Sequence, residues 1–467
     1  MSYSNPKLHS GQLASLRRRW SRTPSLLCNA VLPLAQVQAI LKAEAVQCRD
    51  RIFTPLVTLY AFLGQVLDPD HSCRQAVARV LAWLVGCGRK ACSAENGAYC
   101  RARQRLPERV LARLTCDTGQ RLADKQRRRW HWHGHRVKML DGSVVTAPDT
   151  SANQKAYPQS KTQKAGLGFP LIRIVVLFDL FVGTVLDAAF GPLRGKQTAE
   201  TALWRTLRHN LQPDDILLAD RYHGSFWEVI AARERGSHVV LRIHQRRKVD
   251  FRRGRRLGRD DHLVTWLKYR TCPEWMEQAT YDAMPESLTV REVRIRVPKG
   301  RCRTREIVVV TTLLDPGRYP KGEIAALYRL RWQAELDLRS LKQTLQMDFL
   351  RCKTPAMLRK ELWAHFLVYN LLRTLQVQAA EKYRRKPWQL SFKGTLQTLT
   401  GFAETLAQTP AEQWNEVYDE MLRAVATHRV GNRPNRIEPR AIKRRPKQYP
   451  RLTEPRVKGR LREIHGR

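Results

Sequence analysis

The chain has 467 residues, about three times the usual domain length, and 43% of them are hydrophobic, so it can build several cores and is not compositionally disordered. Lysine and arginine number 84 against 42 acidic residues, and the formal net charge of +42 predicts a polyanionic partner, with nucleic acid favoured over an anionic membrane. No apolar run is long enough for a transmembrane helix, and the ten cysteines contain no C-x-x-C pair, which argues against a zinc ribbon or a disulfide framework.

Residues 1–122 are predicted to form a helical N-terminal DNA-binding domain. Apolar residues recur at spacings of three and four through most of this segment, as expected of amphipathic helices. After Gly86 the sequence predicts a turn and a second helix that carries Arg101, Arg103 and Arg105. A helix–turn–helix that reads DNA and an ordinary helical bundle with a basic face explain this pattern equally well.

A basic connector follows, and it carries alternating histidines. His131, His133 and His135 lie at every second position, a pattern that can indicate a metal-binding tract. Alternation without an acidic partner seldom makes a functional site, however. We therefore expect an exposed strand or loop here.

From Arg136 the periodicity changes to short β-branched or apolar runs with helical stretches between them, which predicts an α/β fold with a mixed sheet. Residues 123–244 form the first part of this core. Residues 245–318 begin with a dense basic stretch and then read as a β-rich insertion. Residues 319–355 return to the core with one long helix, and residues 356–467 are predicted to be a helical C-terminal region that ends in a basic tail lying on phosphates.

Two aspartates stand where apolar strands are predicted to end. Asp141 closes the run VKML and is followed by Gly-Ser, and Asp220 closes ILLA and is followed by Arg-Tyr-His-Gly. A carboxylate at the end of a buried strand is held by a rigid element and still reaches a cleft. Asp179, after IVVLF, is interpreted instead as an ordinary turn or cap residue.

The third acid lies on the predicted helix YRLRWQAELDLRSLKQTL. At about 100° per residue, Tyr328, Arg331, Glu335 and Lys342 share one narrow stripe, whereas Asp337 falls nearly opposite Tyr328. This geometry prefers Glu335 to Asp337 as the functional acid. Taken alone, the helix is explained better by a solvated face with ion pairs from Glu335 to Arg331 and Arg339, so the assignment also depends on the two aspartates. The adjoining apolar stripe, which would dock on the sheet, comprises Leu327, Ala334, Leu338, Leu341 and Leu345.

Together, Asp141, Asp220 and Glu335 provide what two-metal phosphoryl transfer needs. Hard oxygen ligands select Mg²⁺ or Mn²⁺, and two such ions about 4 Å apart activate the attacking oxygen and stabilise the leaving oxygen. Lysines and arginines around the site would hold DNA phosphates.

The sequence resembles the DDE transposases of bacterial insertion sequences, and it is most similar to the insertion sequence 4 family. That branch is marked by Y-x-x-R-x-x-x-E-x(6)-K, which the stripe from Tyr328 to Lys342 matches without departure. Its first acidic motif matches Asp141-Gly142, and its second matches Asp220-Arg221-Tyr222. The resemblance is close over most of residues 136–355 and loose in the flanks.

The resemblance implies an RNase H-like catalytic core whose two Mg²⁺ or Mn²⁺ ions are held by the three acids. It implies that Tyr328, Arg331 and Lys342 contact DNA phosphates near the cleaved end. Some relatives also stack a flipped base on a tryptophan of the insertion. Trp266 and Trp275 are candidates, but neither lies in a matched motif, so a core or surface role is favoured for both.

The implied activity is cut-and-paste transposition. The protein would bind the terminal inverted repeats of its element, nick the DNA with metal-activated water and join the freed 3′-OH ends to target DNA. We expect a homodimer in the synaptic complex and, because the N-terminus shows no apolar signal-peptide core, a cytoplasmic protein associated with the bacterial nucleoid. The alternatives are another RNase H-like endonuclease, which would cleave without joining, and an inert DNA-binding relic.

Overall fold

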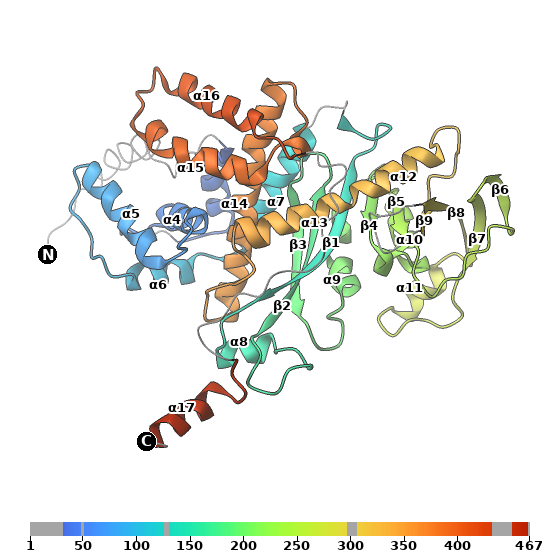
Figure 1. Cartoon of the computed structure of the whole chain (residues 1–467), viewed down its shortest axis with the longest axis horizontal. Helices are drawn as coiled ribbons and strands as arrows, with labels where there is room; N and C mark the ends of the chain where they lie inside the picture. The colour runs from blue at the N-terminus through green and yellow to red at the C-terminus, as the bar shows by residue number, and fades with distance from the viewer. Residues whose placement is uncertain (1–30, 48–50, 126–129, 297–305, 432–450, 466–467) are drawn as a thin grey trace.

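The computed structural model places the helices of both ends of the chain on one side of a long sheet (Figure 1). Helix α17 (Arg456–His465) lies apart from the rest of the molecule. The first 30 residues of the predicted helical N-terminal domain and much of the predicted basic tail lie outside the described part of the chain. The structure describes residues 31–47, 51–125, 130–296, 306–431 and 451–465.

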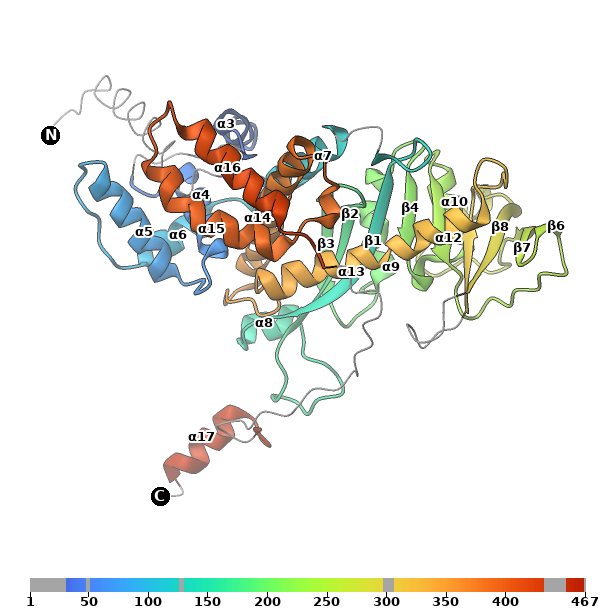
Figure 2. The ribbon, with the colours of Figure 1, turned by 45° about the horizontal axis from the view of Figure 1, so that its top comes forward.

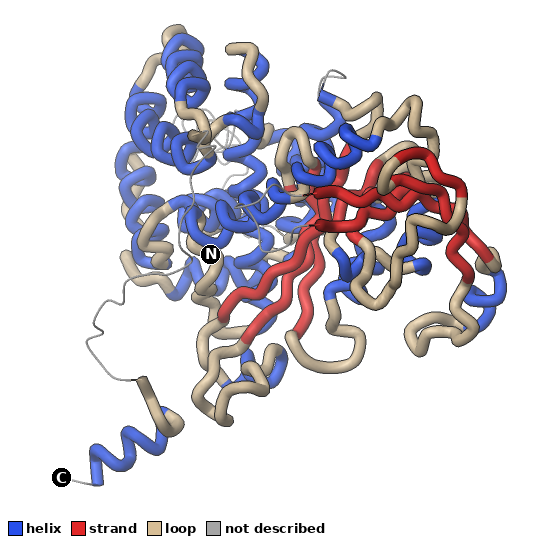
Figure 3. The backbone as a smooth tube through the Cα atoms, turned by 45° about the vertical axis from the view of Figure 1, so that its right-hand side comes forward, coloured by secondary structure: helices blue, strands red, loops and turns tan. Residues whose placement is uncertain are grey.

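One sheet runs through the molecule (Figure 3). The nine strands found in the described ranges lie in the order β3-β2-β1-β4-β5-β9-β8-β7-β6. Its central strands are apolar and buried, as the near-continuous runs in the sequence predict. The strands are β1 (Val137–Thr146), β2 (Leu171–Asp179), β3 (Val185–Pro192), β4 (Ile216–Ala219), β5 (His238–Arg242), β6 (Arg255–Gly258), β7 (Asp261–Leu267), β8 (Ser287–Arg296) and β9 (Glu306–Thr311).

The first five strands form an RNase H-like core. Strand β2 is antiparallel to both β1 and β3, whereas β1, β4 and β5 run parallel to one another. Parallel strands end at the same edge of a sheet, so the residues that follow β4 lie beside the second half of the longer strand β1. The predicted α/β class with a mixed sheet is confirmed.

Strands β6–β9 form an antiparallel meander that extends the same sheet. Strand β9 pairs with β5, and β8 and β7 follow outward. The β-rich segment is therefore continuous with the core rather than a separate layer. Short helices connect strands along the chain: α8 (Ser151–Ala156) follows β1, α9 (Glu200–Leu207) follows β3, α10 (Phe226–Arg233) follows β4 and α11 (Gln278–Ala283) follows β7.

Helix α14, the longest of the described helices, joins the sheet to the helical layer. Its Asn370 donates from Nδ2 to the carbonyl oxygens of Thr115 (3.0 Å) and Val185 (2.8 Å), and its Oδ1 accepts from the Val185 amide (2.8 Å). A Cβ at Gly119 would lie 2.0 Å from the Val185 carbonyl oxygen, so only glycine allows this approach. The layer comprises α3 (Leu34–Ala43), α4 (Pro55–Leu67), α5 (Cys73–Gly86), α6 (Gly97–Arg105), α7 (Glu108–Lys125), α14 (Pro355–Lys382), α15 (Phe392–Gln408) and α16 (Trp414–Thr427).

Helix α6 carries the arginines considered for a DNA-reading helix, and one of them is unavailable. Arg103 is buried, and its guanidinium donates to Gln65 Oε1 (3.2 Å) and to Cys73 Sγ (3.2 Å). Arg101 and Arg105 are exposed. The prediction of a shared basic face is therefore wrong for Arg103, because the middle arginine points into the α4–α6 core. None of the helices in the described ranges combines the length and apolar composition that crossing a bilayer needs.

The segment predicted as one long helix lies across the sheet, with α12 over β5 and α13 against β1 (Figure 2). It consists of α12 (Lys321–Leu330), α13 (Trp332–Arg339) and a π-helical turn (Ser340–Thr344), with a break at Arg331. The predicted apolar stripe is confirmed, since all five members are at most 5% exposed.

Candidate active site

The two aspartates belong to neighbouring parallel strands. Asp220 directly follows the last residue of β4, as predicted, but Asp141 lies in the middle of β1, so the prediction that this strand ends at Asp141 is wrong. Only the buried run ends at Leu140, and β1 continues to Thr146 because it keeps pairing with β2.

Met139 of β1 is paired with Leu218 of β4, and continuing this register by two residues places Asp220 beside Asp141. Residues side by side in a parallel pair point to the same face of the sheet. Asp220 keeps an extended backbone (φ −83°, ψ −179°), so the alignment continues past the last residue of β4.

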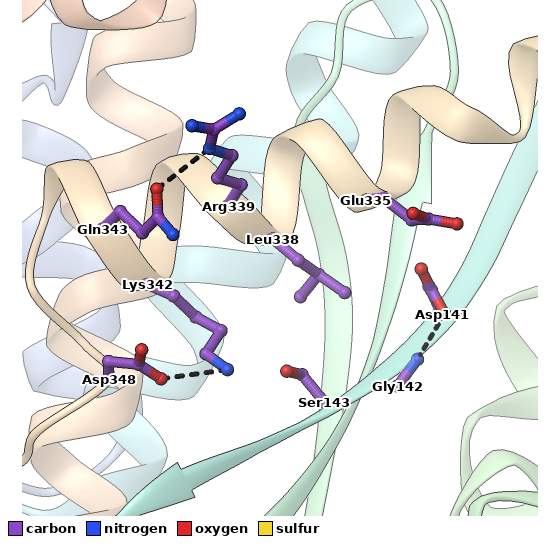
Figure 4. Close-up of a pocket in the computed structure, with 9 residues that line it drawn as sticks. All are labelled: Asp141, Gly142, Ser143, Glu335, Leu338, Arg339, Lys342, Gln343 and Asp348. Carbon is purple, nitrogen blue, oxygen red and sulfur yellow. Dashed lines mark hydrogen bonds and ion pairs between the residues drawn. The ribbon is translucent and has the colours of Figure 1, made fainter. Parts of the chain in front are cut away.

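The third acid approaches from the helix that crosses this face. Glu335 lies in the first turn of α13, and Figure 4 shows its carboxylate facing that of Asp141. Arg331, at the break between α12 and α13, lies between them. Its Nη2 is 2.9 Å from Glu335 Oε1, and its Nη1 is 4.0 Å from Asp141 Oδ2.

Arg331 is within electrostatic reach of all three acids. Burial acts to lower the pKa of Arg331, but the interaction with Tyr328, the hydrogen bond to Glu335 and the negative charges of Asp220 and Asp141 outweigh it, and the pKa is raised above its usual value. One guanidinium thus faces three carboxylates. The cluster carries an excess of negative charge that Arg331 alone does not neutralise.

Asp141 has a raised pKa in this cluster. Burial raises the pKa of Asp141 to about 6 against the opposing charge of Arg331 and the hydrogen bond from the Gly142 amide (2.9 Å), and the charge of Glu335 adds to the rise. A cation that binds beside such a carboxyl group stabilises its ionised form. The oxygen-only donor set fits Mg²⁺ or Mn²⁺.

A cavity of about 280 Å³ opens beside the Asp141–Glu335 pair (Figure 4). The π-helical turn supplies Lys342, whose Nζ is 2.9 Å from Asp348 Oδ1. The acids Asp141 and Glu335 therefore line one end of the cleft, and the Lys342–Asp348 ion pair lines the other. Its lining residues are Asp141, Gly142, Ser143, Glu335, Leu338, Arg339, Lys342, Gln343 and Asp348.

Tyr328 lies deeper than the other signature residues. It is 6% exposed, and burial raises its pKa to about 12, with the charge of Asp220 acting in the same direction. The structure thus brings Tyr328, Arg331 and the three acids to one place. Lys342 reaches the same cleft from further along the helix.

A protein-family model described as "Transposase DDE domain" matches residues 132–371, more than half of the chain. The chain belongs to the DDE transposase family. It is 26% identical to the transposase InsG for insertion sequence element IS4 of Escherichia coli (strain K12), over 95% of this chain and 98% of that protein. This full-length similarity supports membership of the insertion sequence 4 branch.

Other relatives are more distant or cover less of the chain. The putative transposase InsL for insertion sequence element IS186A, also of Escherichia coli (strain K12), is 27% identical over 51% of this chain and 65% of that protein. A cryo-EM structure of a piggyBac transposase synaptic complex with hairpin DNA covers 87% of both chains with 11% identity and a TM-score of 0.43. That structural similarity is too low to support a statement about the site.

The transposase also holds a fourth carboxylate beside Asp141 that the motif did not include. Glu200, in the first turn of α9, receives an ion pair from Arg173 (3.1 Å), and its charge helps to raise the pKa of Asp141. A Cβ at Gly142 would lie 2.6 Å from Glu200 Cδ, so the glycine makes room for this acid. The signals in the sequence were the glycine directly after Asp141 and an acid at the start of the helix that follows β3.

The two tryptophans of the insertion, Trp266 and Trp275, have the core or surface positions that the sequence analysis favoured. Trp266 is 2% exposed, and its indole nitrogen donates to Glu292 Oε1 (2.8 Å), so it is a core residue. Trp275 is half-buried with the Arg205 guanidinium 3.3 Å from its ring centre. Asp179 caps a turn by accepting from the amides of Phe181 (2.8 Å) and Val182 (2.9 Å), as predicted.

Proposed function

We propose that this transposase moves an insertion sequence by a cut-and-paste route. It binds the terminal inverted repeats of its element as a homodimer, cleaves the DNA at each end and joins the freed 3′-OH ends to target DNA. The observation that carries the proposal is the convergence of three acids from β1, the end of β4 and α13 around one arginine.

Asp141, Asp220 and Glu335 would hold two divalent cations, Mg²⁺ or Mn²⁺. Bound there, the cations would supply activation of the attacking oxygen and neutralisation of charge on the leaving oxygen. The reacting phosphate would be held by the cations, and the cations by the three carboxylates. Their shared arginine, Arg331, would turn from the acids to a phosphate oxygen once the cations compensate the acids.

The basic residues in and beside the cleft are the candidates for contacts with DNA phosphates. Arg331 is mostly buried beside the acids, and Lys342 and Arg339 line the cavity. We assign Tyr328, Arg331 and Lys342 to phosphates near the cleaved end. Such contacts position the substrate without reading its sequence.

The test is Mg²⁺-dependent nicking of DNA that carries the terminal repeats of the element. Asp141→Ala, Asp220→Ala and Glu335→Gln should each lower the nicking rate by at least about 10³-fold, because loss of a cation costs several kcal/mol at the transition state. DNA binding should remain. Glu323→Gln is the matched control, since this half-exposed acid lies on α12 outside the cleft lining.

Retained nicking in any of the three variants would overturn the assignment of the acids. A second assay separates transposition from plain nuclease activity. A pre-cut end with a free 3′-OH should be integrated into target DNA, whereas an RNase H-like endonuclease would leave it unjoined. Binding of terminal DNA without cleavage in Mn²⁺ would instead indicate an inert relic.

A further inference from the structure

The histidine alternation that precedes β1 has acidic partners in the folded chain. His133 pairs with Glu323 of α12, and His135 lies with Asp214 and His238 in a cluster whose ligand atoms are all within 4.8 Å of one another. The expectation of an exposed strand or loop is therefore wrong for His135, which is 5% exposed. The acidic partner was invisible in the sequence because it comes from the loop before β4.

The His135 ring is oriented by its surroundings. Its Nδ1 lies 2.7 Å from the backbone carbonyl oxygen of Asp214. A carbonyl oxygen only accepts, so in the neutral ring Nδ1 carries the hydrogen and Nε2 carries the lone pair. Nε2 lies 2.8 Å from the hydroxyl of Tyr319, which donates to it here. An imidazole fixed through Nδ1–H to a carbonyl is the usual arrangement of a histidine that ligates a metal through Nε2.

The other two members are held by the backbone. Asp214 has φ +63°, a left-handed conformation that aspartate tolerates, and its amide donates to the Gly236 carbonyl (3.0 Å). The His238 amide donates to the Asp215 carbonyl (2.7 Å), and its ring centre is 5.3 Å from that of His135.

We propose that His135, Asp214 and His238 form a binding site for Zn²⁺ or a similar late first-row divalent ion. Two imidazoles and one carboxylate are donors that such ions prefer, whereas Mg²⁺ prefers oxygen alone. The site lies at the amino ends of β1, β4 and β5, away from Asp220 at the other end of β4. It would clamp the loop before β4 to both neighbouring strands, and the Nε2 lone pair of His135 would pass from the Tyr319 hydroxyl to the ion.

The test uses full-length transposase that also carries Asp141→Ala and Glu335→Gln, so that the acids of the cleft do not contribute, after removal of metal with a chelator. Zn²⁺ is titrated in competition with a chromophoric chelator, and Co²⁺ serves as a spectroscopic probe. One Zn²⁺ should bind per chain, Co²⁺ should give the visible absorption of a four-coordinate site, and excess Mg²⁺ should not displace either. Zn²⁺ should also raise the melting temperature.

His238→Ala and Asp214→Asn should each weaken Zn²⁺ binding by at least about 10-fold and abolish the Co²⁺ absorption. Asparagine tolerates the left-handed backbone at position 214, so this variant tests the site even if His238→Ala does not fold. His209→Ala is the control, because this exposed histidine lies outside the cluster. Equal Zn²⁺ affinity in the parent and in Asp214→Asn, or no Zn²⁺ binding by the parent, would overturn the proposal.

Discussion

Glu335 and Asp337 lie two residues apart on α13, yet their carboxylates differ in burial and in ion pairing because they lie on different faces of the helix. The Asp337 side chain is 1% exposed and forms an ion pair with the buried guanidinium of Arg373 from α14. The Glu335 side chain is 38% exposed and shares Arg331 with Asp141 and Asp220. Asp337 therefore has an arginine of its own, whereas Glu335 belongs to a group of three acids that share one arginine.

The difference separates structural from functional acids. A buried acid that is matched one to one by an arginine holds two helices together and has no capacity for another cation. A cluster of acids around a single arginine has that capacity and gains little stability from its charges. If this distinction holds, substitutions on the Asp337 face of α13 should lower stability, whereas Glu335 should contribute little to it.

The largest effect is expected on the Asp337 face. Asp337→Asn leaves Arg373 buried without its partner and should lower the free energy of unfolding by about 3–5 kcal/mol, measured by urea denaturation. The double variant Asp337→Leu/Arg373→Met should recover much of this loss, because apolar side chains replace both charges. A loss below about 1 kcal/mol in Asp337→Asn would show that the pair does not stabilise the helical layer.

A pH effect of similar origin is expected from α14, the helix that carries Arg373. Burial lowers the pKa of His365 from 6.5 to about 4, so the unfolded chain binds a proton between these values and the folded chain does not. The contribution of His365 to the free energy of unfolding should therefore be constant above pH 6.5. It should fall by up to about 3 kcal/mol as the pH drops towards 4. The measurement is the unfolding free energy against pH, and His365→Gln should show a shallower fall than the wild type. Parallel pH profiles would contradict the account.

A smaller effect is expected on the open face at Lys342. Lys342→Gln should weaken binding of terminal-repeat DNA by about 10-fold at low salt, as expected for the loss of one charged hydrogen bond. The slope of log affinity against log salt concentration should decrease by about 1. Lys342→Arg should keep most of both quantities. An unchanged slope in Lys342→Gln would place this lysine away from DNA.

The smallest effect is expected for Glu335 itself. Glu335→Gln should change the free energy of unfolding by no more than about 0.5 kcal/mol, because the carboxylate is partly exposed and Arg331 keeps Asp141 and Asp220 as partners. The comparison with Asp337→Asn, by the same denaturation, separates the two acids. A loss as large as that of Asp337→Asn would make Glu335 a structural residue.

The sequence was sufficient for the features that depend on local periodicity. The polar stripe from Tyr328 to Lys342 and the buried apolar stripe beside it follow from spacings of three and four residues, and the position of Asp220 follows from the apolar run before it. The strand that carries Asp141 was predicted too short, because its second half is only partly buried and is fixed by pairing with β2. The choice of Glu335 over Asp337 rested on the helical angle alone, and the different environments of the two carboxylates agree with it.

Features that depend on distant partners were not predictable in this way. The break at Arg331 and the π-helical turn adjust the helix to the sheet beneath it, and no local pattern encodes them. The pairing of Asp337 with Arg373 and the approach of Glu200 to Gly142 each join segments far apart in the chain. Such contacts are decided by packing between elements, which a single sequence does not specify.

The most direct test of the three-acid cluster is a crystal structure with Mn²⁺ and cleaved terminal-repeat DNA, with the ions located by anomalous scattering. The account predicts two Mn²⁺ ions within about 2.3 Å of carboxylate oxygens, with Asp141, Asp220 and Glu335 all among the ligands. Mn²⁺ bound elsewhere, or Asp220 or Glu335 outside the coordination shell of both ions, would contradict it.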